Sequence, residues 1–192
     1  MDQERKRTKP KKRNSSTITV ILRNLSFAAI VVICFVLQST LFHWLDFGGV
    51  IPNLLIIAVA SIGFMRGKYA GILYGFMAGF LIDIFFGTVL GFYALIYMYI
   101  GYMNGFFERI FYPKDIKLPI ILLITSNFLY SIVFYVLVFL LKGKFDFTYY
   151  LLNIIVPEMV YTIVIMIILY PCLLMINYKF DESVRRSARK FV

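Results

Sequence analysis

The chain has 192 residues, of which 61% are hydrophobic and 18% aromatic, and its formal net charge is +10. A soluble domain is nearer half apolar, so this excess in long runs excludes a soluble enzyme core and predicts one polytopic membrane domain. The positive charge lies mainly in residues 1–23 and 179–192. This placement predicts membrane lipids as partners through their anionic headgroups, and no nucleic acid.

The first elements in the chain are a basic tail and a long apolar segment. Residues 1–17 are polar and contain Pro10, so we expect them to be disordered. Helix 18–42 follows as a retained membrane anchor, because its apolar run is too long for a signal peptide and ends without a cleavage site. His43 and Trp44 close it at the opposite interface, the depth that Trp rings favour.

The second helix, 52–65, is short for a membrane span, and a basic turn joins it to the third helix, 69–86. Small residues recur every four positions in the third helix, which lets another helix approach until the backbones nearly touch. The fourth helix, 92–107, has a small pair of its own, so we expect these two helices to form a close antiparallel hairpin. The residues assigned to this packing or interaction surface are Gly71, Gly75, Gly79, Asp83, Gly87, Gly91, Gly101 and Gly105.

Two longer helices complete the predicted bundle. The fifth is 118–141, and the sixth is 149–178, interrupted by Pro157 and Pro171. The predicted organisation is therefore a basic tail at 1–17, an all-α domain of six transmembrane helices at 18–178, and a basic tail at 179–192.

The orientation of the domain follows from its Lys and Arg residues. Six spans place both tails, the turn 66–68 and the loop 108–117 on one side of the membrane. That side then holds 18 of the 20 basic residues. By the positive-inside rule, we predict that both termini are cytoplasmic.

Two carboxylates lie inside apolar helices, where an ionisable side chain is costly and faces protein or a water-filled cavity. Asp83 is one turn from the outer end of helix 69–86, and Glu158 is roughly 13 Å into helix 149–178 from the same side. Together they would form an ion, proton or ligand site; alternatively, each accepts hydrogen bonds from a facing helix or stays protonated. We interpret Asp83 as closing the glycine seam, where it would fix the turn after helix 69–86 or a partner's helix. The candidate buried polar site consists of Asp83, Asn104, Asn127, Asn153 and Glu158.

The sequence contains no evident catalytic constellation. Its only histidine has no cysteine or carboxylate cluster nearby, and neither metal-ligand spacing nor a phosphate-binding glycine loop occurs. We therefore expect no enzyme activity, no cofactor and no metal site. Cys34 and Cys172 lie at different depths of the first and last helices, so we expect no disulfide between them.

From Ile51 to Phe107 the sequence resembles the MreD family of bacterial rod-shape-determining membrane proteins. The resemblance implies a non-catalytic scaffold of the cell-elongation machinery in the bacterial cytoplasmic (inner) membrane. The partners that it implies are an MreC-like protein, MreB-like cytoplasmic filaments and periplasmic peptidoglycan synthases. The points of likeness, in chain order, are Pro52-Asn53, the basic turn, Gly71, Gly75, Gly79, Asp83, Gly87 and Leu90-Gly91.

A second class of function stays open. The small six-helix organisation also resembles the vitamin-binding subunits of energy-coupling-factor transporters, which capture their ligand from outside. Asp83 and Glu158 in the outer half of the bilayer, with tyrosines nearby, would suit such a site. The tyrosines in question are Tyr93, Tyr97 and Tyr161.

Overall fold

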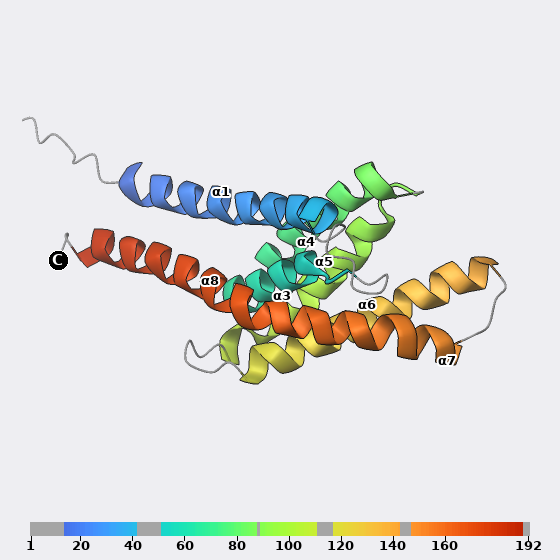
Figure 1. Ribbon diagram of the computed structural model, residues 1–192. Coiled ribbons are helices and arrows are strands. Elements are labelled where there is room, and N and C mark those ends of the chain that lie inside the picture. The colour runs from blue at the N-terminus through green and yellow to red at the C-terminus, as the bar shows by residue number, and fades with distance from the viewer. Residues whose placement is uncertain (1–13, 42–50, 88, 111–116, 143–146, 190–192) are drawn as a thin grey trace, which may run out of the picture.

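The computed structural model describes residues 14–41, 51–87, 89–110, 117–142 and 147–189. All regular structure in these ranges is helical, which confirms the predicted all-α class (Figure 1). Residues 14–17, predicted as the end of the disordered tail 1–17, instead form the start of the first helix, Asn14–Val36. The rest of that tail, His43 and Trp44 fall outside the described residues.

Six helical units form the bundle in the described ranges, at nearly the predicted positions. Short π-helical or 3-10 turns extend three of them, which the sequence did not indicate. The units are α1 (Asn14–Val36) with η1 (Leu37–Leu41); α3 (Leu54–Arg66); α4 (Lys68–Phe86); α5 (Phe92–Gly105) with η2 (Phe106–Ile110); α6 (Lys117–Lys142); and α7 (Phe147–Tyr150), η3 (Leu151–Ile155) and α8 (Val156–Arg189).

Four of these units contain a segment long and apolar enough to cross a membrane: Val20–Thr40, Lys68–Phe86, Lys117–Val136 and Thr148–Glu182. The α-helices α3 and α5 are shorter, with 13 and 14 residues. A 13-residue helix rises about 20 Å, whereas the hydrocarbon core of a bilayer is about 30 Å thick.

The short helix α3 is the centre of the bundle. Every residue from Leu54 to Met65 is buried, because α1, α4, α5, α6 and α8 all pack against it. A helix enclosed on all sides needs no polar face, which explains why its sequence is apolar throughout. Protein therefore shields α3 from lipid, and its length does not have to match the bilayer.

The helix α8 is longer than predicted, because it continues past Tyr178 to Arg189. The helical unit continues through both prolines that were predicted to interrupt it, because η3 runs directly into α8 before Pro157 and α8 continues past Pro171. The start of α1 and the end of α8 lie on the same side of the bundle, where both project past the ends of the other helices (Figure 1).

Candidate functional site

The closest helix contact in the bundle is the glycine seam, formed by Gly71, Gly75 and Gly79 of α4 and Gly101 and Gly105 of α5. A Cβ atom added at any of them would lie within 3.0 Å of backbone atoms on the facing segment, closer than real side chains approach. The order of contacts is antiparallel, as the predicted hairpin requires. The facing pairs are Lys68 with Gly105, Gly71 with Gly101, Gly75 with Tyr97, and Gly79 with Ala94.

The seam also includes one glycine that the sequence analysis missed. A Cβ atom at Gly63 of α3 would lie 2.6 Å from the carbonyl oxygen of Gly101, so α3 approaches α5 at the same place. Gly63 precedes Gly67 by four residues and so continues the spacing of the ladder backwards into α3, a signal that the sequence analysis did not use. Three helices thus meet at backbone distance around Gly101.

The two remaining predicted glycines belong to the turn between α4 and α5. A Cβ atom at Gly87 would lie 2.6 Å from the carbonyl oxygen of Asp83. Gly91 has open space around it, but its φ of 92° falls in the left-handed region, which L side chains rarely adopt. Gly87 is therefore required for close approach and Gly91 for its backbone conformation.

Asp83 holds this turn in place. Its side chain is 1% exposed, and its Oδ2 atom accepts hydrogen bonds from the backbone N–H groups of Gly91 (3.0 Å) and Ala94 (2.9 Å). Its Oδ1 atom accepts one from the N–H of Tyr93 at 2.9 Å. These donors open α5, where N–H groups have no partner within their own helix and the helix dipole favours a negative charge. Asp83 of α4 therefore caps α5.

A second polar network joins three helices at Asn53, directly before α3. The Oδ1 atom of Asn53 accepts hydrogen bonds from the N–H of Ile56 (3.1 Å) and from the hydroxyl of Tyr97 on α5 (2.9 Å). Its backbone N–H donates to Oγ1 of Thr162 on α8 at 3.1 Å. The sequence signal for Asn53 was present, since Asn before an apolar run is a typical helix N-cap. Nothing in the sequence connected it to Thr162.

Glu158 lies one helical turn before Thr162, on the same face of α8. It is partly buried and interacts electrostatically with Tyr97 of α5 and Tyr130 of α6. The carboxylate of Asp83, in contrast, is held by backbone amides at the α4–α5 turn. Among the described residues, no hydrogen bond or ion pair joins the two acids. Tyr93, whose N–H donates to Asp83, interacts electrostatically with Tyr97 and Tyr130, the tyrosines that neighbour Glu158.

The three predicted asparagines lie in different places. Asn104 is buried and links α5 to α6, because its Nδ2 atom donates to the carbonyl of Ile100 (2.8 Å) and to Oγ of Ser126 (2.7 Å). Asn127 is 1% exposed, and its side-chain nitrogen and oxygen have no hydrogen-bond partner among the described residues.

Asn153 corrects the prediction, because its side chain is exposed. Its Nδ2 atom donates to the carbonyl of Tyr149 on its own helical unit at 2.9 Å, which satisfies part of the amide without a partner helix. The five predicted polar residues therefore do not form one buried site.

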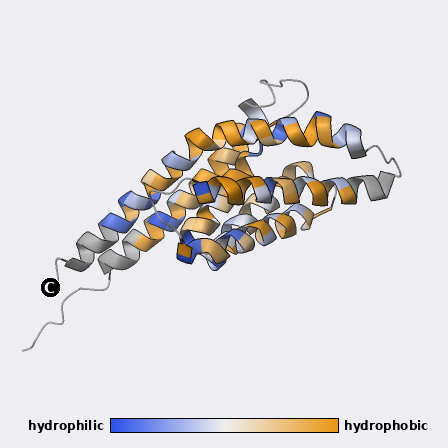
Figure 2. Ribbon diagram, turned by 90° about the horizontal axis from the view of Figure 1, so that it is seen from below, coloured by the Kyte–Doolittle hydropathy of each residue, from blue (hydrophilic) through white to orange (hydrophobic). Residues whose placement is uncertain are grey.

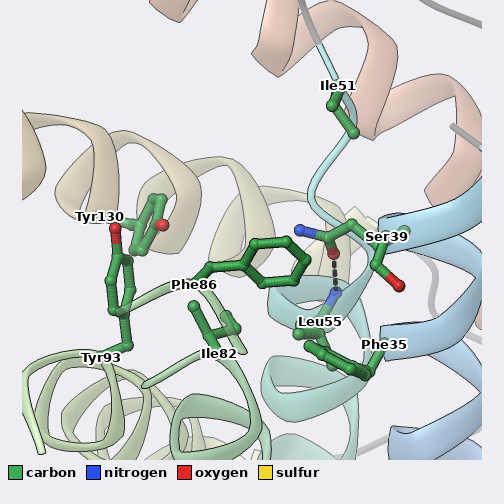
Figure 3. Close-up of a pocket in the computed structure, with 9 residues that line it drawn as sticks. Phe35, Ser39, Ile51, Leu55, Ile82, Phe86, Tyr93 and Tyr130 are labelled. Atoms are coloured by element: carbon green, nitrogen blue, oxygen red, sulfur yellow. Dashed lines mark hydrogen bonds between the residues drawn. The ribbon is translucent and has the colours of Figure 1, made fainter. Parts of the chain in front are cut away.

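A cavity of about 240 Å³ opens between η1, α3, α4, α5 and α6 (Figure 3). The Oε1 atom of Gln38 accepts a hydrogen bond from the N–H of Leu55 at 3.1 Å and so attaches η1 to the start of α3. The volume is slightly below the usual range for small-molecule pockets, about 300–1,000 Å³. The lining combines the polar residues Gln38, Ser39, Tyr93 and Tyr130 with the apolar residues Phe35, Ile51, Leu55, Ile82 and Phe86.

A charged cluster lies near the projecting ends of α1 and α8. Oδ1 of Asp181 on α8 accepts hydrogen bonds from Nη1 of Arg66 on α3 (3.1 Å) and Nη1 of Arg23 on α1 (3.5 Å). We call these three residues the arginine cluster. It ties together three helices that are distant in sequence, and two cations share one carboxylate.

The described residues contain no group of three His, Cys, Asp or Glu side chains that would hold a metal ion. Cys34 is a buried free thiol and Cys172 an exposed one.

Comparison with known proteins gives one family. The model of the family described as rod shape-determining protein MreD matches residues 18–179. The matched range contains the glycine seam, Asp83, the Asn53 network and Glu158. Neither a curated protein nor a solved structure matches the chain.

Proposed function

Since the chain belongs to the MreD family of rod shape-determining proteins, we propose that it is a non-catalytic scaffold of the bacterial cell-elongation machinery. The resemblance noted for residues 51–107 is confirmed and extends over residues 18–179. Membership implies a role in determining rod shape and a location in the bacterial inner membrane. The finer proposal is that the protein links MreB-like filaments in the cytoplasm and an MreC-like protein to periplasmic peptidoglycan synthases.

The hydrogen bonds that Asp83 accepts are the observation that supports a scaffold best. A carboxylate inside a membrane helix is a candidate for ion binding or catalysis. Here both of its oxygens accept hydrogen bonds from backbone amides of the next helix. Asn53, which opens the stretch that resembles the family, likewise holds helices together. Asp83 thus fixes the α4–α5 turn and Asn53 joins α3, α5 and α8, which suits a protein that positions others.

The proposed orientation has both termini in the cytoplasm. It is supported by the distribution of Lys and Arg, and by the start of α1 and the end of α8 lying at the same end of the bundle (Figure 1). In this orientation the filaments would meet the projecting ends of α1 and α8. The MreC-like protein would connect the membrane domain with the synthases on the other side.

Depletion of the protein from its rod-shaped host is the test of this function. We expect depleted cells to widen and become round, and expression of the wild-type chain to restore rods. Tagged protein extracted in mild detergent should recover an MreC-like partner, whereas an unrelated polytopic protein with the same tag should not. Normal rods after depletion would contradict a role in shape, and recovery of no such partner would contradict the scaffold proposal alone.

The cavity favours one alternative, a vitamin-like ligand-binding subunit of an energy-coupling-factor type transporter. Its lining has hydroxyl and amide groups among aromatic rings, as a small polar ligand would require. A ligand at 100 times its dissociation constant would stabilise the fold by about 2.7 kcal/mol. We therefore expect a raised unfolding temperature with one member of a vitamin panel, and a smaller shift for Tyr130→Phe. Absence of any shift across the panel would contradict this alternative.

A further inference from the structure

The arginine cluster has no part in the scaffold proposal, and its chemistry points to a ligand. Arg23, Arg66 and Asp181 lie where α1 and α8 leave the bundle, and hydrophilic residues gather in the same region (Figure 2). The side chains of Arg23 and Arg66 are only 14% and 18% exposed, so neither guanidinium is freely solvated.

Donors exceed acceptors in the cluster. Each guanidinium carries five N–H donors, and one oxygen of Asp181 accepts from both. The Nε atom of Arg23 is buried and has no hydrogen-bond partner among the described residues. The cluster therefore keeps a net positive charge and donors that an additional anion would satisfy. A phosphate group, with several acceptor oxygens, has the geometry that arginine recognises best.

The depth of the cluster matches that of lipid phosphates. Arg23 lies five residues after Ile18, where the apolar run of α1 begins, or about 7.5 Å of helical rise from its polar end. Asp181 lies three residues after Tyr178, where the apolar sequence of α8 gives way to charged residues. Both side chains thus fall at the boundary between the hydrocarbon core and the headgroups.

Exposed apolar side chains lie near the cluster along α1 and α8. Ile21, Leu22 and Leu25 of α1 are 58%, 50% and 64% exposed, and Met175 of α8 is 61% exposed. Free phosphate would make no use of this surface, whereas acyl chains would cover it. We propose that the arginine cluster binds the phosphate of an anionic phospholipid, whose chains lie along α1 and α8. This lipid site goes beyond the scaffold function. In the proposed orientation it would lie in the cytoplasmic leaflet, and only this placement depends on that orientation.

Lipid titration of the full chain in neutral detergent, followed by native mass spectrometry, tests the site. We expect phosphatidylglycerol to bind at least fivefold more tightly than phosphatidylcholine with the same acyl chains, and inorganic phosphate not to displace it. Arg66→Gln should weaken phosphatidylglycerol binding about fivefold, the equivalent of about 1 kcal/mol for one charge near an anionic headgroup. Lys179→Gln, an exposed charge outside the cluster, is the matched control and should change binding less than twofold.

Asp181→Asn distinguishes a lipid site from a purely structural cluster. Removing the carboxylate raises the charge of the cluster by one, so phosphatidylglycerol affinity should rise about fivefold. A structural cluster would lose stability with no gain in lipid selectivity. If Arg66→Gln does not fold, the proposal is still tested by Asp181→Asn and by the preference of the wild-type protein for phosphatidylglycerol over phosphatidylcholine. The proposal would be overturned if both lipids bound equally, which is the result expected of a site for an acidic protein segment. Displacement of phosphatidylglycerol by inorganic phosphate would overturn it as well.

Discussion

Asp83→Ala is expected to destabilise the folded protein by about 3 kcal/mol or more and to lower its amount in the membrane. The substitution leaves three N–H groups at the start of α5 without their acceptor, and a buried donor without a partner costs about 1–3 kcal/mol. Thermal unfolding of the purified protein, followed by size-exclusion chromatography after heating, would measure the loss.

Asp83→Asn should have an intermediate effect. The single amide oxygen of asparagine can replace one carboxylate oxygen, but its NH₂ group then faces an N–H donor of the turn. Glu158→Gln is the matched control, because it makes the same change in the other intramembrane acid, which does not cap this turn. We expect a much smaller loss for the control. A wild-type unfolding temperature for Asp83→Ala would show that Asp83 does not hold the turn.

Gly75→Leu is expected to prevent α4 and α5 from packing and to leave little folded protein. A Cβ atom at this position already collides with the backbone of Tyr97, and the backbone of a helix cannot move aside as a flexible side chain does. Ordinary overpacking of a core costs about 1–3 kcal/mol. Leucine adds three further carbon atoms to a contact that has no room for one, so we expect a greater cost. The measurement is the yield of monodisperse protein after detergent extraction.

Leu73→Phe is the control for this substitution, because it adds bulk to the same helix at a side chain that is 53% exposed. It should leave yield and unfolding temperature close to those of the wild type. Gly75→Ala, with one added carbon, should fall between the control and Gly75→Leu. If Gly75→Leu folds and still co-purifies with the MreC-like partner, α4 and α5 do not depend on the close contact at Gly75.

The hairpin of α4 and α5 could be predicted because its determinants are local in sequence. Glycine spacing indicates a close helix contact, and the donors to Asp83 lie only 8 to 11 residues after it. The number of helices also followed from the sequence, since apolar runs and charged turns reflect the bilayer itself. The sequence indicated Asp83 as important without showing which groups it binds.

Other features could not be predicted from one sequence. Asp181 and Arg23 are 158 residues apart, and no spacing reveals such a pair. The end of α8 was placed too early because hydropathy reports membrane burial, whereas the charged residues after Tyr178 are good helix formers in water. Asn127 follows Thr125 and Ser126 and is buried, whereas Asn153 is flanked only by Leu and Ile and is exposed, so the polarity of the neighbours does not predict burial. The π-helical η3 changes the rotation per residue, so counting along the helix does not give the face of Asn153.

The enclosure of α3 has a consequence for how the protein is made. Ribosomal synthesis delivers α3 before α4, α5, α6 and α8, which supply most of its surroundings. A nascent chain that ends before α8 has no Thr162 to accept the hydrogen bond from Asn53. Early in biogenesis α3 is therefore a short hydrophobic segment without its final neighbours, and its assembly is completed only when the last helix leaves the translocon. Packing of the C-terminal helix α8 against α3 is thus the last step in the assembly of the bundle.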